Sequence, residues 1–172
     1  HSKIRQFFTN PKKPIAFRIL HPDSNDKAVN PEKISKTHTP VPLISNKALD
    51  GFISLKHRAA EHALIPKTWL QEDHNVQCSR VKGDSMAPTL PDGSIVAIDF
   101  DNRTVQNGSI FLLKWKKKVV IRRTVFQDSY VLFYPDNADK EKYPIEVSSM
   151  KKAKSAKNNL VLGKVIWGME KG

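Results

Sequence analysis

The sequence predicts a mostly β fold, and three observations lead to this prediction. Short apolar runs recur at intervals of roughly ten residues, which is typical of the strands of an all-β domain. Glycine, proline and Asn/Asp-Gly turn signals separate these runs. No internal repeat and no convincing helix-turn-helix pattern is visible in the chain. We therefore expect a mostly antiparallel β domain.

The predicted strands follow one another from Val41 onward. Ile95–Ile98 reads as a buried strand after the Asp92-Gly93 turn, and Asn107-Gly108 is a turn signal before the next apolar run. Lys116–Lys118 forms the tip of a predicted hairpin. The predicted strands after the first are Ile110–Leu113, Val119–Ile121, Tyr130–Tyr134, Ile145–Val147 and Leu160–Ile166. We expect the C-terminal apolar segment Leu160–Trp167 to have an exposed edge in the monomer, and such an edge is commonly covered by a partner.

Residues 1–40 differ from the rest of the chain. They are rich in proline and basic residues and contain one apolar cluster, Ile15–Leu20. This composition favours a largely irregular N-terminal linker with one docked segment. We expect a linker or tail over 1–40 and a separate folded domain over 41–172.

Composition limits the class of protein. The 172 residues carry a formal net charge of +12, which favours polyanionic partners such as nucleic acid, although a merely basic surface is also compatible with it. Cys78 is the one cysteine, so no intrachain disulfide can form, as suits a reducing cytoplasm. No apolar run approaches the roughly 20 residues that span a bilayer, and no signal peptide is visible. We expect a cytoplasmic protein without a membrane partner.

The most specific motif is the string from Gly83 to Gly93, Gly-Asp-Ser-Met-Ala-Pro-Thr-Leu-Pro-Asp-Gly. Its serine, Ser85, stands just ahead of a proline-fixed turn, a place that can present a hydroxyl rigidly. A Gly-Asp-Ser triplet alone would suit an ordinary turn or N-cap serine. The whole string, however, resembles the nucleophile motif of the LexA/CI-repressor/UmuD family of Ser–Lys autoproteases.

The resemblance extends over roughly residues 41–169. Further matching strings are Asp92–Val96, Asn107–Phe111, Tyr134–Asn137 and Leu160–Ile166. The resemblance implies that residues 41–172 are a regulatory and dimerisation domain with a curved LexA/signal-peptidase-like β-fold that forms a homodimer, and that the linker 1–40 follows an N-terminal DNA-binding domain. It also implies a transcriptional repressor of the SOS or prophage type, which binds DNA through an upstream helix-turn-helix domain and responds to an activating or antirepressor protein.

The residues that self-cleavage requires are altered in this chain. A serine hydroxyl needs a base, and in the family that base is a buried lysine whose neutral form desolvation makes available. Ungapped matching from Asn107-Gly108 places Arg122 where that lysine belongs. An arginine side chain stays protonated at physiological pH, so it cannot readily act as a base. The lysines from Lys114 to Lys118 are nearby, but we expect them to be solvated at the hairpin tip.

The segment that would be cut also departs from the family. Gly51 lies near the position of the family's scissile glycine, but Asp50 precedes it where the family usually has alanine or cysteine. Placing a carboxylate beside the nucleophile is costly, since the charge must lose water. We therefore interpret the domain as a pseudo-protease that keeps Ser85. The alternative is an active self-cleaving repressor or UmuD-like protein with an unrecognised base.

Other residues carry less information. A type I signal peptidase shares part of the serine motif, but it requires a membrane anchor. The histidines are scattered without metal-ligand spacing, so we expect no metal and no cofactor. Basic clusters at Lys114–Lys118 with Arg122-Arg123, and at Lys151–Lys157, suit either a solvated face or phosphate contacts, and we favour the solvated face. We expect Trp69, Trp115 and Trp167 in the core or a dimer interface.

Overall fold

The computed structural model describes residues 36–44, 61–116, 118–139, 141–155 and 158–169, and these build one mixed sheet of nine strands. The strands are β1 (His38–Ile44), β2 (Glu61–Pro66), β3 (Val76–Arg80), β4 (Ile95–Asp99), β5 (Ile110–Trp115), β6 (Lys118–Gln127), β7 (Tyr130–Tyr134), β8 (Glu146–Ser149) and β9 (Val161–Met169). A 3₁₀ turn, η1 (Lys67–Trp69), follows β2, and a one-turn helix, α3 (Met150–Ala153), follows β8. The mostly β fold expected from the sequence is confirmed.

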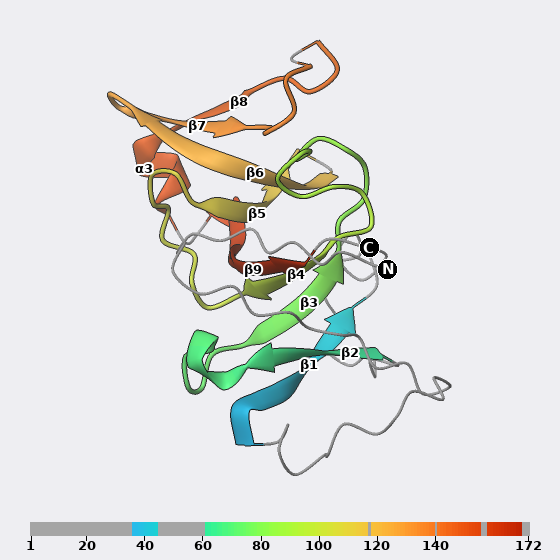
Figure 1. The fold of residues 1–172 in the computed structure, drawn as a ribbon. Helices are drawn as coiled ribbons and strands as arrows, with labels where there is room; N and C mark the ends of the chain where they lie inside the picture. The colour runs from blue at the N-terminus through green and yellow to red at the C-terminus, as the bar shows by residue number, and fades with distance from the viewer. Residues whose placement is uncertain (1–35, 45–60, 117, 140, 156–157, 170–172) are drawn as a thin grey trace.

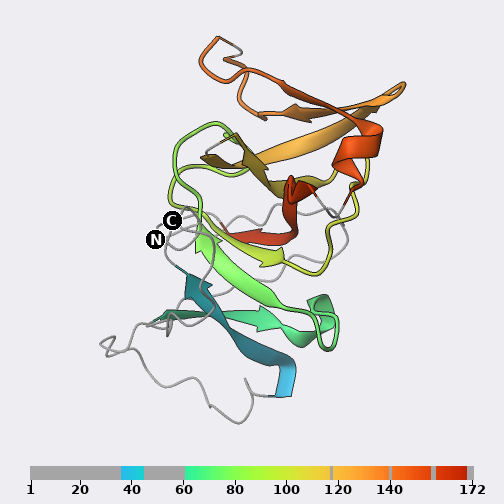
Figure 2. The same cartoon turned by 180° about the vertical axis from the view of Figure 1, so that it is seen from behind.

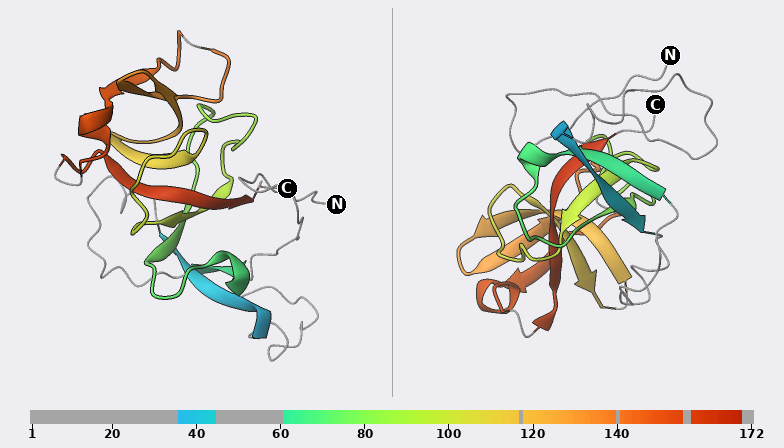
Figure 3. Two further views of the ribbon diagram at one scale, coloured as in Figure 1. Left: turned by 90° about the vertical axis from the view of Figure 1, so that its left-hand side faces the viewer. Right: turned by 90° about the horizontal axis from the view of Figure 1, so that it is seen from below.

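The strands lie in the order β2-β1-β3-β4-β9-β5-β6-β7-β8 (Figure 1). All neighbours are antiparallel except β1 and β3, which run parallel. The sheet twists strongly along its length, so that the strands fan out when it is viewed from below (Figure 3). Helix α3 packs beside β7 and β8 at one end of the sheet (Figure 2).

The prediction of an exposed edge at Leu160–Trp167 is wrong. β9 lies in the interior of the sheet, because its second half pairs with β4 and its first half with β5. The edges of the described sheet are β2 and β8 instead. Gly163 shows how tightly β9 is enclosed, since a Cβ there would lie 2.7 Å from the carbonyl oxygen of Asp99.

Three apolar clusters form the core. The cluster next to the serine motif holds Met86, Leu90 and the inward-facing side chains of β4, β5 and β9. A second cluster joins β1, β2 and β3 to Trp167 on β9, and a third lies between β5, β7 and α3. Burial of these side chains supplies the main stabilisation of the sheet. Trp167 is therefore a core residue, as expected, while Trp69 packs against the second cluster and Trp115 against the third.

Local turn chemistry explains the best-predicted elements. Gly108 has a φ of +76°, a conformation that glycine adopts without strain, and β5 begins two residues later as the Asn-Gly signal predicts. Trp115 pairs with Lys118 at the closed end of the β5–β6 hairpin, and β7 spans Tyr130–Tyr134 as predicted. β1 begins at His38, slightly before the predicted domain start at residue 41. The apolar cluster Ile15–Leu20 lies outside the described residues.

Candidate functional site

The loop between β3 and β4 carries Ser85. Its two ends are joined by backbone hydrogen bonds: Val81 N donates to Ser94 O at 2.7 Å, and Gly93 N donates to Val81 O at 2.9 Å. Inside the loop, the side chains of Met86 and Leu90 are buried in the core, which anchors the turn on either side of Pro88. Ser85 itself remains partly exposed. The loop therefore presents the hydroxyl from a fixed backbone, as the motif predicts.

The turn after β7 holds the serine loop from the other side. Asn137 Nδ2 donates to the carbonyl oxygen of Asp84 at 2.9 Å, and Asn137 N donates to the carbonyl oxygen of Ser85 at 3.1 Å. These two bonds join segments far apart in the chain. The string Tyr134–Asn137, which matched the family only as a turn, thus has a physical role in positioning the residue at the nucleophile position.

A polar cluster surrounds the carboxylate of Asp84. The hydroxyl of Tyr143 donates a short hydrogen bond to Asp84, and Lys142 Nζ lies 3.3 Å from both carboxylate oxygens. The hydrogen bond from Tyr143 is the main cause that lowers the pKa of Asp84 below its ordinary value of 3.8; a backbone hydrogen bond and Lys142 lower it further, against the opposite effect of desolvation. The pKa of Lys142 is raised by its interactions with Tyr143 and Asp84. Lys142 is therefore held in its charged form and is poorly suited to act as a base.

Arg122 on β6 reaches the serine directly. Its Nη1 donates to Ser85 Oγ at 3.1 Å and also to the carbonyl oxygen of Ile121 at 2.8 Å. Only 5% of Arg122 is exposed. The side chain predicted to replace the family's lysine therefore lies within hydrogen-bond distance of the predicted nucleophile position.

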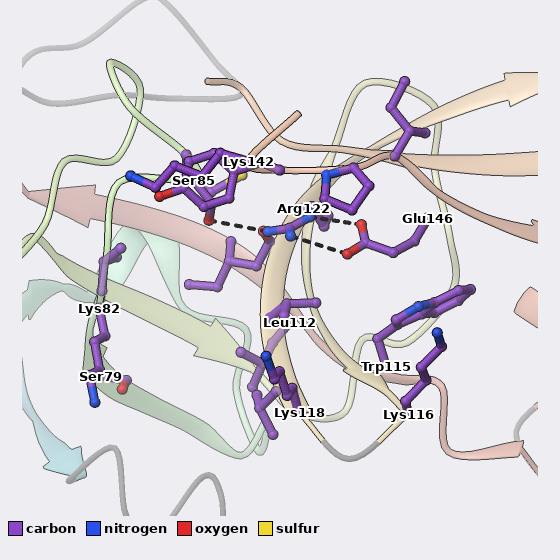
Figure 4. A pocket seen from close by; sticks show the side chains of 18 of the residues that line it. Ser79, Lys82, Ser85, Leu112, Trp115, Lys116, Lys118, Arg122, Lys142 and Glu146 are labelled. Atoms are coloured by element: carbon purple, nitrogen blue, oxygen red, sulfur yellow. Dashed lines mark hydrogen bonds and ion pairs between the residues drawn. The ribbon is translucent and has the colours of Figure 1, made fainter. Parts of the chain in front are cut away.

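Glu146 on β8 completes the cluster and was missed by sequence reasoning. Its two carboxylate oxygens accept from Arg122 Nε at 2.8 Å and Arg122 Nη2 at 3.1 Å (Figure 4). Both side chains are buried, and such a bidentate pair fixes the orientation of the guanidinium. The sequence hides it, because the alternation Ile145-Glu146-Val147 predicts an exposed acid between two inward-facing apolar residues, whereas Glu146 is buried and its two neighbours are exposed.

The arrangement places a fixed positive group where proton abstraction would need a neutral amine. Ser85 Oγ accepts a hydrogen bond from Arg122, so one of its lone pairs faces a cation. The carboxylate of Glu146 is occupied by Arg122 and has no described contact with Ser85. The hydroxyl of Ser85 keeps its own hydrogen, and it can donate that hydrogen to an acceptor in the adjoining cleft.

Ser85 and Arg122 line a cleft of about 1180 Å³, which we call the Ser85 cleft. Its walls come from the end of β3, the β5–β6 hairpin and residues 142–147. Lys116 and Lys118 lie in the same cleft, but both side chains are exposed, as predicted for the hairpin tip. Burial therefore offers neither lysine the desolvation that yields a neutral amine.

The remaining candidates of the sequence are placed as follows. Asp50 and Gly51 lie outside the described residues. Arg122 and Arg123 do not belong to the solvated basic face that the sequence favoured, because Arg122 is buried and Arg123 Nη2 forms an ion pair with Asp136 Oδ2 at 2.6 Å.

His74 Nδ1 lies 2.7 Å from Asp99 Oδ2, and within the described part of the chain no group of three potential metal ligands occurs. No described helix is both long and apolar enough to cross a membrane.

Comparison with protein families agrees with this geometry. No curated protein matches the chain. The family described as Peptidase S24-like matches residues 42–166, which include the serine loop, Arg122 and Glu146. Because this match covers most of the chain, the protein belongs to the Peptidase S24-like family.

Proposed function

We propose that this chain is the regulatory and dimerisation domain of a LexA/CI-type transcriptional repressor and that it does not cleave itself. The observation that carries the proposal is the hydrogen bond from Arg122 to Ser85, at the position where a self-cleaving domain needs a lysine. The same guanidinium is paired with Glu146 in a buried site. The fold and the serine loop are retained, while the group that would activate the serine is replaced.

The chemical reason is the lack of a proton acceptor. A serine becomes a useful nucleophile when a neighbouring base takes its proton. An arginine stays protonated at physiological pH, and its carboxylate partner stabilises that charge. Among the described lysines that line the Ser85 cleft, Lys82, Lys116 and Lys118 are exposed, and Lys142 is paired with Asp84. None of them combines burial with a free amine.

A domain that cannot cut itself can still regulate by association. In the proposal, the chain forms a homodimer, binds DNA through an upstream helix-turn-helix domain, and is relieved by an activating or antirepressor protein. These partners are part of the proposal, by analogy with the LexA/CI-type repressors that the chain resembles. Because β9 lies inside the sheet, dimerisation would use another surface than the strand first expected.

A repressor fusion tests this function. The chain is joined behind a helix-turn-helix domain that represses a reporter only when dimerised. We expect repression that persists in an SOS-induced cell, with the fusion staying at full length. A fusion that leaves the reporter active, together with a monomer mass in sedimentation at micromolar concentration, would contradict the dimerisation role.

The alternative function, active self-cleavage, is favoured by one observation and can be tested. Lys116 and Lys118 share the cleft with Ser85, and a movement of the hairpin could bring either amine nearer to the hydroxyl. In that case cleavage would depend on one of these lysines. Replacing both with methionine should then abolish a cut that the unmodified chain makes.

A further inference from the structure

The Ser85 cleft has a strong excess of positive charge. Six basic side chains line it, and Glu146 is the one acidic side chain among its described lining residues. The basic residues are Arg80, Lys82, Lys116, Lys118, Arg122 and Lys142. Two of them, Arg122 and Lys142, are balanced by Glu146 and Asp84. Arg80 has an interaction of its own, so three of the six basic side chains are available to a ligand.

Three lysines carry that available charge. Lys82 lies just after β3, while Lys116 and Lys118 lie at the β5–β6 hairpin on another wall of the cleft (Figure 4). Within the described part of the chain, none of these three ammonium groups takes part in an ion pair. Positive groups on separate walls of one cleft attract a ligand that has several negative groups along its length.

Most of the other residues that line the cleft are apolar. Val81, Leu112, Val119 and Ile121 contribute aliphatic side chains to it. Ile145 and Val147 also line the cleft, and they are two of the three large hydrophobic residues that are exposed in the described structure, at 36% and 50%. Exposed apolar side chains that gather within a cleft mark a binding surface for another apolar group.

We propose that the Ser85 cleft binds an extended acidic segment of a partner protein. Acidic side chains of the segment would face Lys82, Lys116 and Lys118, and its apolar side chains would cover the aliphatic wall. A strand-like peptide alternates its side chains between two sides, which suits a cleft that is lined by both charged and aliphatic side chains. The Ser85 hydroxyl would donate to a carbonyl of the segment, a role that its contact with Arg122 leaves open.

Charge argues for a partner rather than the chain's own connection between β1 and β2. Residues 45–60 contain the basic residues Lys47, Lys56 and Arg58 against the single acid Asp50. A segment with more basic than acidic residues complements a basic cleft less well than an acidic segment does. Trp115 and Tyr143 are the two aromatic residues among the described lining of the cleft, and aliphatic residues outnumber them. This mainly aliphatic lining favours a peptide over a nucleic-acid strand, whose bases stack best on aromatic rings. The inference rests on the proposed function in one respect, namely that the peptide is held without being cut.

Fluorescence anisotropy tests the inference with the full chain and a labelled peptide that alternates glutamate with leucine. Matched probes are the same peptide with lysine in place of glutamate, and a single-stranded oligothymidine of equal length. The cleft variant carries Lys82→Glu with Lys118→Glu. The control variant carries Lys151→Glu with Lys154→Glu, which makes the same charge change at exposed residues that do not line the cleft.

We expect the acidic peptide to bind, and the cleft variant to weaken binding by about tenfold or more, while the control variant changes it by less than about threefold. Equal losses in both variants, tighter binding of oligothymidine, or no binding of the acidic peptide would each overturn the inference. Mass analysis of the peptide after incubation separates the two proposals. A cut peptide would refute the proposal that the domain does not cleave. An intact peptide that does not bind would refute only the proposal that the cleft binds an acidic segment.

Discussion

Arg122 and Glu146 form an ion pair between two strands that are not neighbours. Arg122 lies on β6 and Glu146 on β8, and β7 separates these strands in the sheet. The pair can form because β7 ends at Tyr134, which pairs with Arg123 on β6. Arg122 precedes Arg123, so its side chain extends past the end of β7. The same side chain touches Ser85, and the pair therefore links the edge of the sheet to the serine loop.

Breaking this pair should destabilise the fold strongly. We expect Glu146→Gln to lower the free energy of unfolding by about 3 kcal/mol, because it leaves a buried guanidinium without its counter-charge. Replacing both residues, Arg122→Met with Glu146→Leu, should restore most of the loss, since no charge is then buried. Urea denaturation measures each value.

A second pair on the same strand supplies the control. The ion pair of Arg123 with Asp136 is more exposed on its arginine side, at 30% of the side chain against 6% for Arg122. We expect Asp136→Asn to cost about 1 kcal/mol, because a partly solvated arginine can regain water. Equal losses of unfolding free energy at the two sites would show that burial of the Arg122–Glu146 pair does not raise the cost of breaking it.

Glu146 also determines whether the single substitution Arg122→Lys can produce self-cleavage. We expect Arg122→Lys alone to remain uncut, because Glu146 would hold the new ammonium group in its charged form. Adding Glu146→Gln and Asp50→Ala should give the first detectable cleavage, since a buried lysine without an acidic partner can become neutral. Intact-mass analysis after alkaline incubation follows both variants. Cleavage by Arg122→Lys alone would show that Glu146 does not hold the charge.

The cluster at Asp84 predicts a response to acid. The pKa of Asp84 is lowered in the folded state, so its contribution to stability is present above the ordinary value of 3.8 and is lost as the pH falls through the lower folded value. Tyr143→Phe removes the first cause of this shift. Carboxyl NMR titration should place the midpoint of Asp84 below 3.8 in the unmodified chain and closer to 3.8 in Tyr143→Phe. An unchanged midpoint would mean that Tyr143 does not stabilise the carboxylate.

Cys78 provides a probe of global unfolding. The side chain is fully buried on β3, and desolvation raises the pKa of its thiol from 9.0 to about 12. We expect the native protein to react slowly with thiol reagents at mildly alkaline pH and to react at once in denaturant, because the thiolate is the reactive form. As the pH rises from 9.0 towards 12, the unfolded thiol ionises first, and this favours unfolding. Rapid labelling of the native protein would contradict the burial of β3.

Local sequence signals predicted several strands well. The Asn107-Gly108 turn and the hairpin tip lie between residues that are close in the chain, so their geometry depends on short-range chemistry. β3 was missed because Gln77 and Ser79 make it look polar, although both residues are buried between β1 and β4. The interior position of β9 depends on pairing with β4 and β5, which the sequence of β9 alone does not specify.

The candidate site likewise contains residues that the sequence predicted and residues that only the fold reveals. Ser85 and Arg122 could be found from a motif and its spacing, and the structure brings them within 3.1 Å. Glu146 could not be placed without the fold, because its partner lies 24 positions away and two strands across the sheet. The clamp from Asn137 to the serine loop likewise depends on the course of the chain through β7. Contacts of this kind arise only when distant segments pack together.

Incubation of the purified chain tests the central claim most directly. The protein is held at neutral and mildly alkaline pH beside a Ser85→Ala variant, and intact mass is recorded over time. The account predicts one species of full length in both samples, because Arg122 cannot take the proton of Ser85 at either pH. A fragment that begins at Gly51 in the unmodified chain, and is absent from Ser85→Ala, would contradict it.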